Sequence, residues 1–341
     1  MQVLLTGNRG YIGTVVTEFL SSRGIRVIGL DTDYYRDCDF LDLPEPVQQI
    51  YKDSRRIEKA DLKGVDAVIH LAALSNDPVG ELNEQWTYDI NYHASLQLAR
   101  LAKEVGLPCF LSASSCSLYG ISSADEKLTE EAPMAPLTAY AKSKVQCEES
   151  IRPLADAKFA AVFMRFATVY GVSPRLRFDL VLNNLVGWAY ATGKIRILSD
   201  GTPWRPLVHV KDIAQALWCV LEKPPRGGCE VFNVGDNNAN YQVKELAACV
   251  QKTVPGASIE FTHEHGKDAR TFRVDFSRFH RTFPSFRARW DIAKGARELY
   301  EVLLQKKLRF EDFDGRRFTR LKQIRYLLNQ RRLDEGLFWR H

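Results

Sequence analysis

The chain has 341 residues, with 47 Lys and Arg against 42 Asp and Glu, and a formal net charge of +5 at pH 7. This length allows a large buried core, and 45% hydrophobic and 26% charged residues are ordinary values for a globular protein. Much of the positive excess lies in one C-terminal segment, RRFTRLKQIRYLLNQRR (316–332). The composition therefore does not indicate a general nucleic-acid-binding protein, and we expect no nucleic-acid partner.

The cysteines and the apolar segments indicate a cytoplasmic location. No CxxC pair and no Cys/His spacing typical of zinc occurs, so we expect reduced thiols and no metal site. The N-terminal MQVLLTGNRG has no basic region or cleavage site, and no uninterrupted apolar run reaches the roughly 18 residues of a membrane span, so no membrane partner is expected. The seven cysteines are residues 38, 109, 116, 147, 219, 229 and 249.

Apolar segments of strand length alternate with segments of helical pattern. Apolar residues at three-to-four spacing predict helices such as 12–22 and 91–105. This alternation predicts an α/β fold built from right-handed βαβ units, with a parallel sheet covered on both faces. The predicted strands are residues 2–6, 25–31, 66–73, 108–115, 159–171 and 230–235. The less regular segments 172–205 and 235–300 predict a smaller lobe.

A glycine-rich turn follows the first predicted strand. TGNRGYIG (6–13) places Gly7, Gly10 and Gly13 where glycine permits a tight turn and a close approach of backbone N–H groups to a diphosphate. Asp31 ends the next strand, and a carboxylate there accepts hydrogen bonds from ribose hydroxyls, which favours NAD. Arg9 beside the turn could instead hold a 2′-phosphate, so NADP stays possible.

Two side chains with proton-transfer chemistry follow the Ser-rich strand end LSASSCSLYG (111–120). TAYAKSK (138–144) sets Tyr140 and Lys144 four residues apart, on one face of a helix. A phenol has a pKa of about 10 and is a poor base at neutral pH. A nearby ammonium and an oxidised nicotinamide are expected to lower that pKa.

Together these segments resemble the extended short-chain dehydrogenase/reductase family, in its NAD-dependent nucleotide-sugar epimerase/dehydratase branch. The likeness covers roughly residues 1–300. The resemblance implies a Rossmann-type, doubly wound parallel sheet in an NAD(P)-binding domain at 1–171, to which the core strand 230–235 and part of 205–222 return. A nucleotide-sugar-binding lobe would comprise 172–204 and 236–303, followed by a basic helical extension at 304–341. The matching segments are TGNRGYIG, KDSRR (52–56), HLAA (70–73), INYHAS (90–95), SSCSLYG (114–120), YAKSK (140–144), RFATVYG (165–171) and RPLVHVKDIAQA (205–216).

The resemblance also implies the site residues. The catalytic set would be Ser115, Tyr140 and Lys144, with Ser115 holding the reacting oxygen of the sugar, Tyr140 moving its proton and Lys144 also holding the nicotinamide ribose. The other cofactor-binding residues would be Gly7, Asn8, Arg9, Gly10, Tyr11, Ile12, Gly13, Asp31, Asp53, Ser54, Leu71, Ala72 and Ala73. The substrate-binding residues, besides Ser115, would be Cys116, Ser117, Thr168, Asn184, Arg205, Asp268 and Arg270.

The residues after the serine bear on the reaction. Dehydratases of the family carry an acid at one or both places after the equivalent serine, whereas Ser115 is followed by Cys116 and Ser117, so dehydration is disfavoured. Epimerisation of an NDP-sugar at C4 through a transient keto sugar is favoured. The alternative is an NAD(P)H-dependent 4-keto-NDP-sugar reductase. A reductase of non-nucleotide ketones and a catalytically silent NAD(P)-binding protein are less favoured.

Four further expectations concern residues around this site. The side chain of His209 is predicted to lie in the core. Arg175 and Arg177 could reach a sugar acid or phosphate, or could lie on the solvated surface. The extension is predicted to form helices packed on the lobe or across a subunit boundary. In this family, helices such as 91–105 and 140–152 commonly pair between subunits, so a homodimer is expected.

Overall fold

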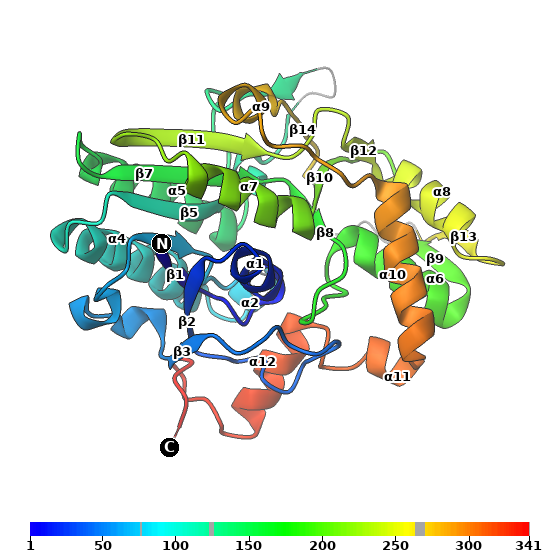
Figure 1. The fold of residues 1–341 in the computed structure, drawn as a ribbon. Coiled ribbons are helices and arrows are strands. Elements are labelled where there is room, and N and C mark those ends of the chain that lie inside the picture. Colours follow the sequence, from blue (N-terminus) through cyan, green and yellow to red (C-terminus); the bar gives the residue numbers. More distant parts are fainter. Residues whose placement is uncertain (76, 123–125, 263–269, 341) are drawn as a thin grey trace.

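The computed structural model of the chain describes residues 1–75, 77–122, 126–262 and 270–340, and its centre is a seven-stranded parallel sheet (Figure 1). The strand order is β11-β7-β5-β4-β1-β2-β3. This confirms the predicted Rossmann-type α/β fold. The strands are β1 (Gln2–Thr6), β2 (Arg26–Asp31), β3 (Gln48–Tyr51), β4 (Ala67–His70), β5 (Cys109–Ser115), β7 (Ala160–Phe166) and β11 (Gly228–Val234).

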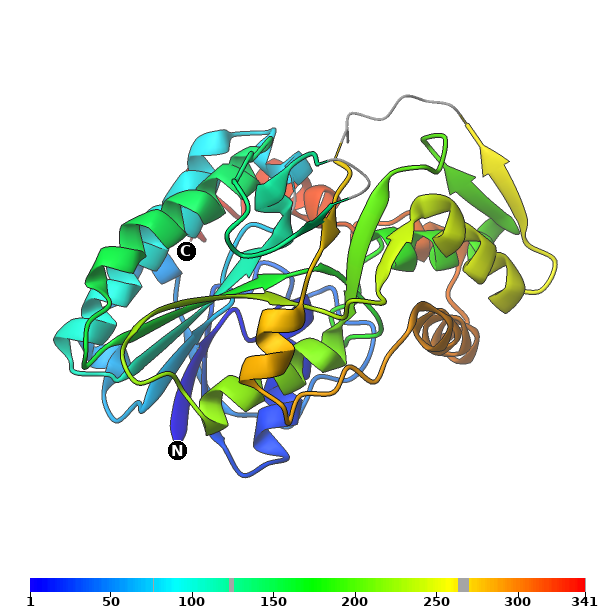
Figure 2. The ribbon, with the colours of Figure 1, turned by 90° about the horizontal axis from the view of Figure 1, so that it is seen from above.

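Helices cover both faces of the sheet, and β1 shows why its strands are apolar throughout. Successive side chains of a strand point to opposite faces. Val3 and Leu5 accordingly pack in one core with α1 (Tyr11–Ser21) and α7 (Val210–Glu222), and Leu4 packs in a second core with α4 (Ala94–Glu104) and α5 (Ala139–Ile151). Figure 2 shows these two helical layers on either side of the sheet.

A smaller group of elements lies beside the sheet, as Figure 2 shows. It contains α6 (Val181–Thr192), α8 (Val243–Thr253), α10 (Ile292–Lys306) and the strand pair β9 (Lys194–Ile197) and β13 (Ser258–Phe261). His209 lies close to it, with Nε2 3.0 Å from Glu298 and its ring stacked on Trp290, and it is buried as predicted. The residue ranges assigned to the two domains stay a prediction.

The structure differs from the expected elements at two strands. The predicted strand 159–171 divides at Ala167, whose N–H donates to the carbonyl of Val234, and the continuation β8 (Thr168–Tyr170) pairs with β10 (Trp204–His209) in a separate sheet. The edge strand β3 was not predicted, because its sequence QQIY has no apolar run. The other elements are β6 (Lys127–Leu128), β12 (Asn240–Gln242), β14 (Arg273–Val274), α2 (Asp77–Gly80), α3 (Glu84–Thr87), α9 (Ser277–Thr282), α11 (Phe310–Phe313) and α12 (Arg320–Asn329).

The C-terminal extension is helical, as predicted, but it does not pack on the lobe alone. Phe313 of α11 lies against α6, whereas α12 lies against α2. Apolar side chains of the extension share a buried cluster with residues from the N-terminal third of the chain, which are Tyr34, Leu74, Val79 and Ile90. The extension thus joins the two parts of the molecule. None of the described helices combines the length and apolar composition that a bilayer crossing requires.

His70, at the end of β4, makes stability depend on pH. Its Nδ1 lies 2.7 Å from Thr6 Oγ1 and its Nε2 2.7 Å from Ser95 Oγ. Burial lowers the pKa of His70 from 6.5 to about 3, with the charge of Lys144 adding to the effect. The unfolded chain therefore gains a proton below pH 6.5 that the folded chain does not, and stability falls as the pH decreases.

We expect the free energy of unfolding to fall by about 2 kcal/mol between pH 7 and pH 5 because of the His70 imidazole. Thermal melts should show a flatter pH dependence for His70→Asn than for the wild type, because asparagine does not titrate. The matched control is His93→Asn, at an exposed position of the neighbouring helical segment, which should keep the wild-type slope. Equal slopes for His70→Asn and the wild type would contradict the assignment.

Candidate active site

A cavity of about 620 Å³ opens at the carboxyl ends of the central strands. Its lining includes the turn after β1 and the segment after β4. These two strands are neighbours in the sheet, and the strand order reverses between them. In doubly wound sheets ligands bind at this switch point. Residues of the smaller lobe and of the C-terminal extension also line the cavity.

The glycine turn brings the N-terminus of α1 to this cavity. Gly7 has φ +74°, and a Cβ there would lie 2.7 Å from the backbone nitrogen of Ala72, so only glycine fits. Gly10, Tyr11, Ile12 and Gly13 line the cavity, and so do Leu71, Ala72 and Ala73 on the facing segment. The first-turn N–H groups of a helix have no acceptors within the helix, which leaves them available to an anion.

Not every residue of the turn faces the cavity. The side chain of Asn8 hydrogen-bonds Gln49, and Arg9 pairs with Asp33 at 2.6 Å, and neither residue lines the cavity. The Tyr11 phenol donates to the carbonyl of Gly171 at 2.7 Å. The guanidinium of Arg9 is therefore already neutralised by a carboxylate, which weakens the case for a 2′-phosphate.

Two predicted carboxylates lie at the cavity. Asp31 ends β2, accepts hydrogen bonds from the N–H groups of Arg9 at 3.0 Å and Asp33 at 2.7 Å, and has its pKa raised by burial. Asp53 pairs with Arg55 at 2.7 Å, and the buried Ser54 follows it. Asp31, Asp53 and Ser54 all line the cavity, as the resemblance implied for the nucleotide end.

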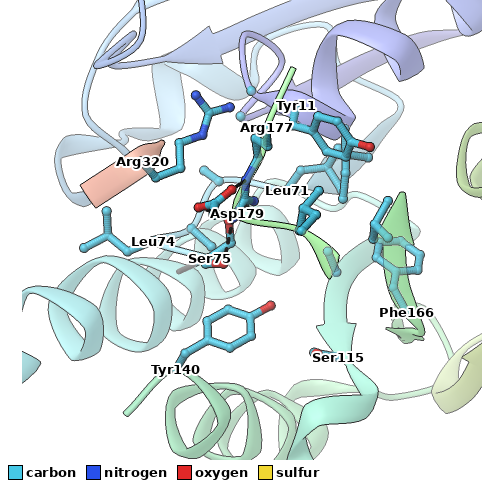
Figure 3. A pocket seen from close by; sticks show the side chains of 18 of the residues that line it. Tyr11, Leu71, Leu74, Ser75, Ser115, Tyr140, Phe166, Arg177, Asp179 and Arg320 are labelled. Carbon is cyan, nitrogen blue, oxygen red and sulfur yellow. Dashed lines mark hydrogen bonds and ion pairs between the residues drawn. The ribbon is translucent and has the colours of Figure 1, made fainter. Parts of the chain in front are cut away.

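Ser115, Tyr140 and Lys144 line the same cavity. Figure 3 shows Tyr140 and Ser115 in it. Thr138 caps α5 by accepting the N–H of Ala141 and so fixes where the helix begins. Lys144 is buried, donates to the carbonyl of Ala113 at 2.7 Å and lies 5.8 Å from the centre of the Tyr140 ring. The structure thus brings together three residues that the sequence places on two separate elements, and their catalytic roles stay a prediction.

The ionisation of Tyr140 differs from the expectation. Burial raises the pKa of Tyr140 to about 12, and the hydrogen bond with Ser115 only partly opposes this. Burial also lowers the pKa of Lys144. Desolvation of the phenolate therefore outweighs the charges of Arg177 and Arg270. The predicted lowering of the Tyr140 pKa depends also on an oxidised nicotinamide and stays a prediction.

Most predicted substrate residues line the same cavity. They are Ser117, Thr168, Asn184, Arg205 and Arg270. Ser117 accepts a hydrogen bond from Ser115 at 2.9 Å, and Arg270 pairs with Asp77 at 3.0 Å. The Cys116 thiol instead lies in the core and donates to the carbonyl of Arg165, although the residue contributes to the lining. Asp268 lies outside the described residues.

The arginines after β8 are not on the surface. Arg175 is buried and pairs with Asp33 and Asp39, and Arg177 is buried and pairs with Asp179 at 2.8 Å. The solvated alternative is therefore wrong for both. Arg177 lines the cavity, whereas Arg175 supports its wall from behind.

Sequence reasoning missed four charged residues of the lining, which are Lys52, Asp77, Asp179 and Arg320. The sequence could have indicated Asp77, because Asp77 lies only a few residues after HLAA, at the end of a strand that borders the cavity. Asp179 lies two residues from Arg177, and an Arg-x-Asp pair in an apolar setting is a signal for a buried ion pair. Arg320 gave no signal, since it lies beyond the segments that resemble the family.

The sheet, the glycine turn with Asp31 and the Ser115, Tyr140 and Lys144 cluster define an NAD-dependent enzyme of the extended short-chain dehydrogenase/reductase class. The sequence model described as the NAD dependent epimerase/dehydratase family matches residues 3–235. The chain belongs to this family, and NAD is its cofactor.

Similar proteins share both sequence and fold with the chain. A UDP-glucuronate 4-epimerase of Thermodesulfobacterium geofontis is 28% identical in an alignment of 291 residues that covers 81% of this chain and 88% of the relative. A UDP-glucose 4-epimerase of Bacillus subtilis is 25% identical over 76% of this chain and 84% of its own. The structure of MoeE5 in complex with UDP-glucose and NAD matches with a TM-score of 0.75 and 25% identity, over 90% of this chain and 100% of that one.

Asp31 should set the preference for NAD. We expect Asp31→Ser to weaken NAD binding about tenfold or more, because ribose hydroxyls lose a charged acceptor, and to reduce the discrimination against NADP. Calorimetric titration of cofactor-free protein with both dinucleotides measures this. Asp42→Ser removes the same charge at an exposed position and should change neither affinity. An unchanged NAD affinity in Asp31→Ser would show that Asp31 does not contact the ribose.

Proposed function

We propose that this protein is a UDP-sugar 4-epimerase that works through a transient 4-keto sugar. The observation that carries the proposal is the cluster of Ser115, Tyr140 and Lys144 in a cavity that also contains Arg205 and Asn184. A guanidinium suits the geometry of a substrate diphosphate. The relatives that are UDP-glucuronate and UDP-glucose 4-epimerases support UDP as the nucleotide.

In this mechanism the phenolate of Tyr140 takes up the proton of the C4 hydroxyl, and the resulting phenol later returns it. When bound, NAD supplies the hydride acceptor and donor and, while oxidised, a positive charge close to the phenol. Ser115 hydrogen-bonds the reacting oxygen of the sugar and relays the proton of the sugar hydroxyl to Tyr140. Ser117 orients Ser115, because the Ser117 N–H donates to the Ser115 hydroxyl at 3.1 Å. Lys144 holds the ribose and adds positive charge beside the ring. Rotation of the keto sugar before hydride returns inverts C4.

The cofactor end supports epimerisation over reduction. A reductase consumes NADH or NADPH in every turnover, and biosynthetic reductases more often use NADPH. Arg9, the residue that left NADP possible, is engaged by Asp33 at 2.6 Å, and Asp31 puts a second carboxylate at the same place. Two carboxylates disfavour a 2′-phosphate, so this geometry favours NAD that is reduced and reoxidised within one cycle.

Dehydration is the second candidate, and Asp77 is the observation that favours it. Its Oδ1 is buried and has no hydrogen-bond partner among the described residues, and the residue lines the same cavity as Tyr140. A carboxylate there could remove a proton beside the transient ketone. The other oxygen of Asp77 pairs with Arg270 at 3.0 Å, which favours a role in holding the cavity wall.

Product analysis separates these reactions. The purified protein, without added cofactor, is incubated with UDP-glucose and UDP-glucuronate and followed by proton NMR. An epimerase produces a mixture of the two C4 epimers with no net change in NAD. A dehydratase would produce a keto-deoxy sugar, and a reductase would leave both substrates unchanged while oxidising added NADH or NADPH in the presence of a keto sugar. Either result would overturn the proposal.

Tyr140→Phe should reduce turnover about 10²- to 10⁴-fold, because the proton acceptor is lost. The NAD content of the denatured protein, measured by chromatography, should stay close to the wild-type value. Tyr300→Phe on α10, outside the cavity lining, is the matched control and should leave both values unchanged. Full activity in Tyr140→Phe would refute the role of the phenol.

A further inference from the structure

Arg320, the first residue of α12, is a buried cation at the cavity. It is 4% exposed, lines the cavity and belongs to the extension beyond the segment that matches the family. Its guanidinium lies 3.8 Å from the centre of the Tyr35 ring, and its Nη2 is 3.4 Å from the carbonyl of Arg175. Its Nη1 is buried and has no hydrogen-bond partner among the described residues. A buried, incompletely bonded guanidinium is costly and suits an anionic ligand.

The charges nearby do not balance Arg320. Asp179, a carboxylate of the same lining whose charge acts on Arg320, is engaged by Arg177 at 2.8 Å and 3.1 Å. These three side chains together carry one excess positive charge. Burial and the charge of Arg177 lower the pKa of Arg320. Figure 3 shows Arg320, Arg177 and Asp179 at one edge of the cavity, with Tyr140 and Ser115 at the other.

The extension is attached to the nucleotide end of the cavity. The indole of Trp339 donates to the carbonyl of Thr32 at 2.6 Å, and the phenol of Tyr34 donates to the carbonyl of Leu337 at 2.6 Å. Thr32 directly follows Asp31, the predicted ribose ligand, and Tyr34 lies two residues further along the chain. Arg320 is thus held beside the segment that receives the dinucleotide rather than beside Arg205.

A third attachment lies at the predicted adenine segment. Arg55, which pairs with Asp53, donates to the carbonyl of Gly336 at 2.6 Å, and its guanidinium lies 3.7 Å from the centre of the Phe338 ring. The extension therefore covers both segments that border the nucleotide half of the cavity. A ligand bound there would contact the sheet on one side and lie close to the extension on the other.

We propose that Arg320 binds the diphosphate of NAD, and that the C-terminal extension retains the dinucleotide in the cavity. The glycine turn supplies neutral N–H donors at the start of α1, and Arg320 supplies the charge that these donors lack. This role concerns NAD binding, so it holds whether the reaction is epimerisation or dehydration.

The experiment compares Arg320→Gln with Arg325→Gln, an exposed position on the same helix. Calorimetry on cofactor-free full-length protein measures binding of ADP-ribose, adenosine and UDP. We expect Arg320→Gln to weaken ADP-ribose binding about 10- to 100-fold and to leave adenosine and UDP nearly unchanged. NAD content after purification should fall in Arg320→Gln and not in Arg325→Gln. Arg320→Lys, which keeps the charge but not the planar donors, should show an intermediate loss.

Two outcomes would overturn the proposal. Unchanged ADP-ribose binding in Arg320→Gln would show that Arg320 does not contact the dinucleotide diphosphate. Weaker UDP binding with unchanged ADP-ribose binding would assign it to the substrate diphosphate. If Arg320→Gln does not fold, Arg320→Lys takes its place, and wild-type ADP-ribose affinity in Arg320→Lys would contradict the expected intermediate loss and so the guanidinium contact. Diphosphate-dependent binding without epimerase activity would instead count against the proposed function alone.

Discussion

The cavity depends on how closely the chain leaving β1 passes the segment after β4. Gly7 donates its N–H to the carbonyl of Leu30 at 2.8 Å, and its α-carbon leaves no space for a side chain beside Ala72. The turn therefore lies in close contact with the end of the sheet. As a result, the first N–H groups of α1, which have no acceptor within the helix, lie at the cavity. Asp31 is fixed to the same turn through the N–H of Arg9. One close backbone contact thus positions the nucleotide end of the site.

The ionisable groups around the cavity are held away from their ordinary pKa values by burial. The pKa of Tyr140 is raised, and the pKa values of Lys144 and Arg320 are lowered. Each shift disfavours the charged form of its group. By the roles proposed for Tyr140 and Arg320, a positive nicotinamide would favour the phenolate and a negative diphosphate would favour the charged guanidinium.

The features that sequence predicted best are those determined locally. Strands buried on both faces appear as continuous apolar runs, and Gly7 and the Tyr140–Lys144 spacing carry their chemistry within a few residues. The features it missed depend on distant partners. Arg175 is buried because Asp33, 142 residues away in the chain, pairs with it. The pKa of Tyr140 depends on desolvation, which residue spacing does not encode.

The position of the extension bears on whether the dinucleotide leaves the site between turnovers. An epimerase returns the hydride to the same sugar and so does not need to release its dinucleotide. A reductase must exchange the oxidised dinucleotide for a reduced one in every turnover. Three hydrogen bonds of 2.6 Å join the extension to Thr32, Tyr34 and Arg55, and α11 anchors its other end on the lobe. Exchange of the dinucleotide past this covering would require several of these contacts to break together. If the extension retains the dinucleotide as proposed, release of the dinucleotide is slow, which suits a cofactor that is regenerated within each turnover.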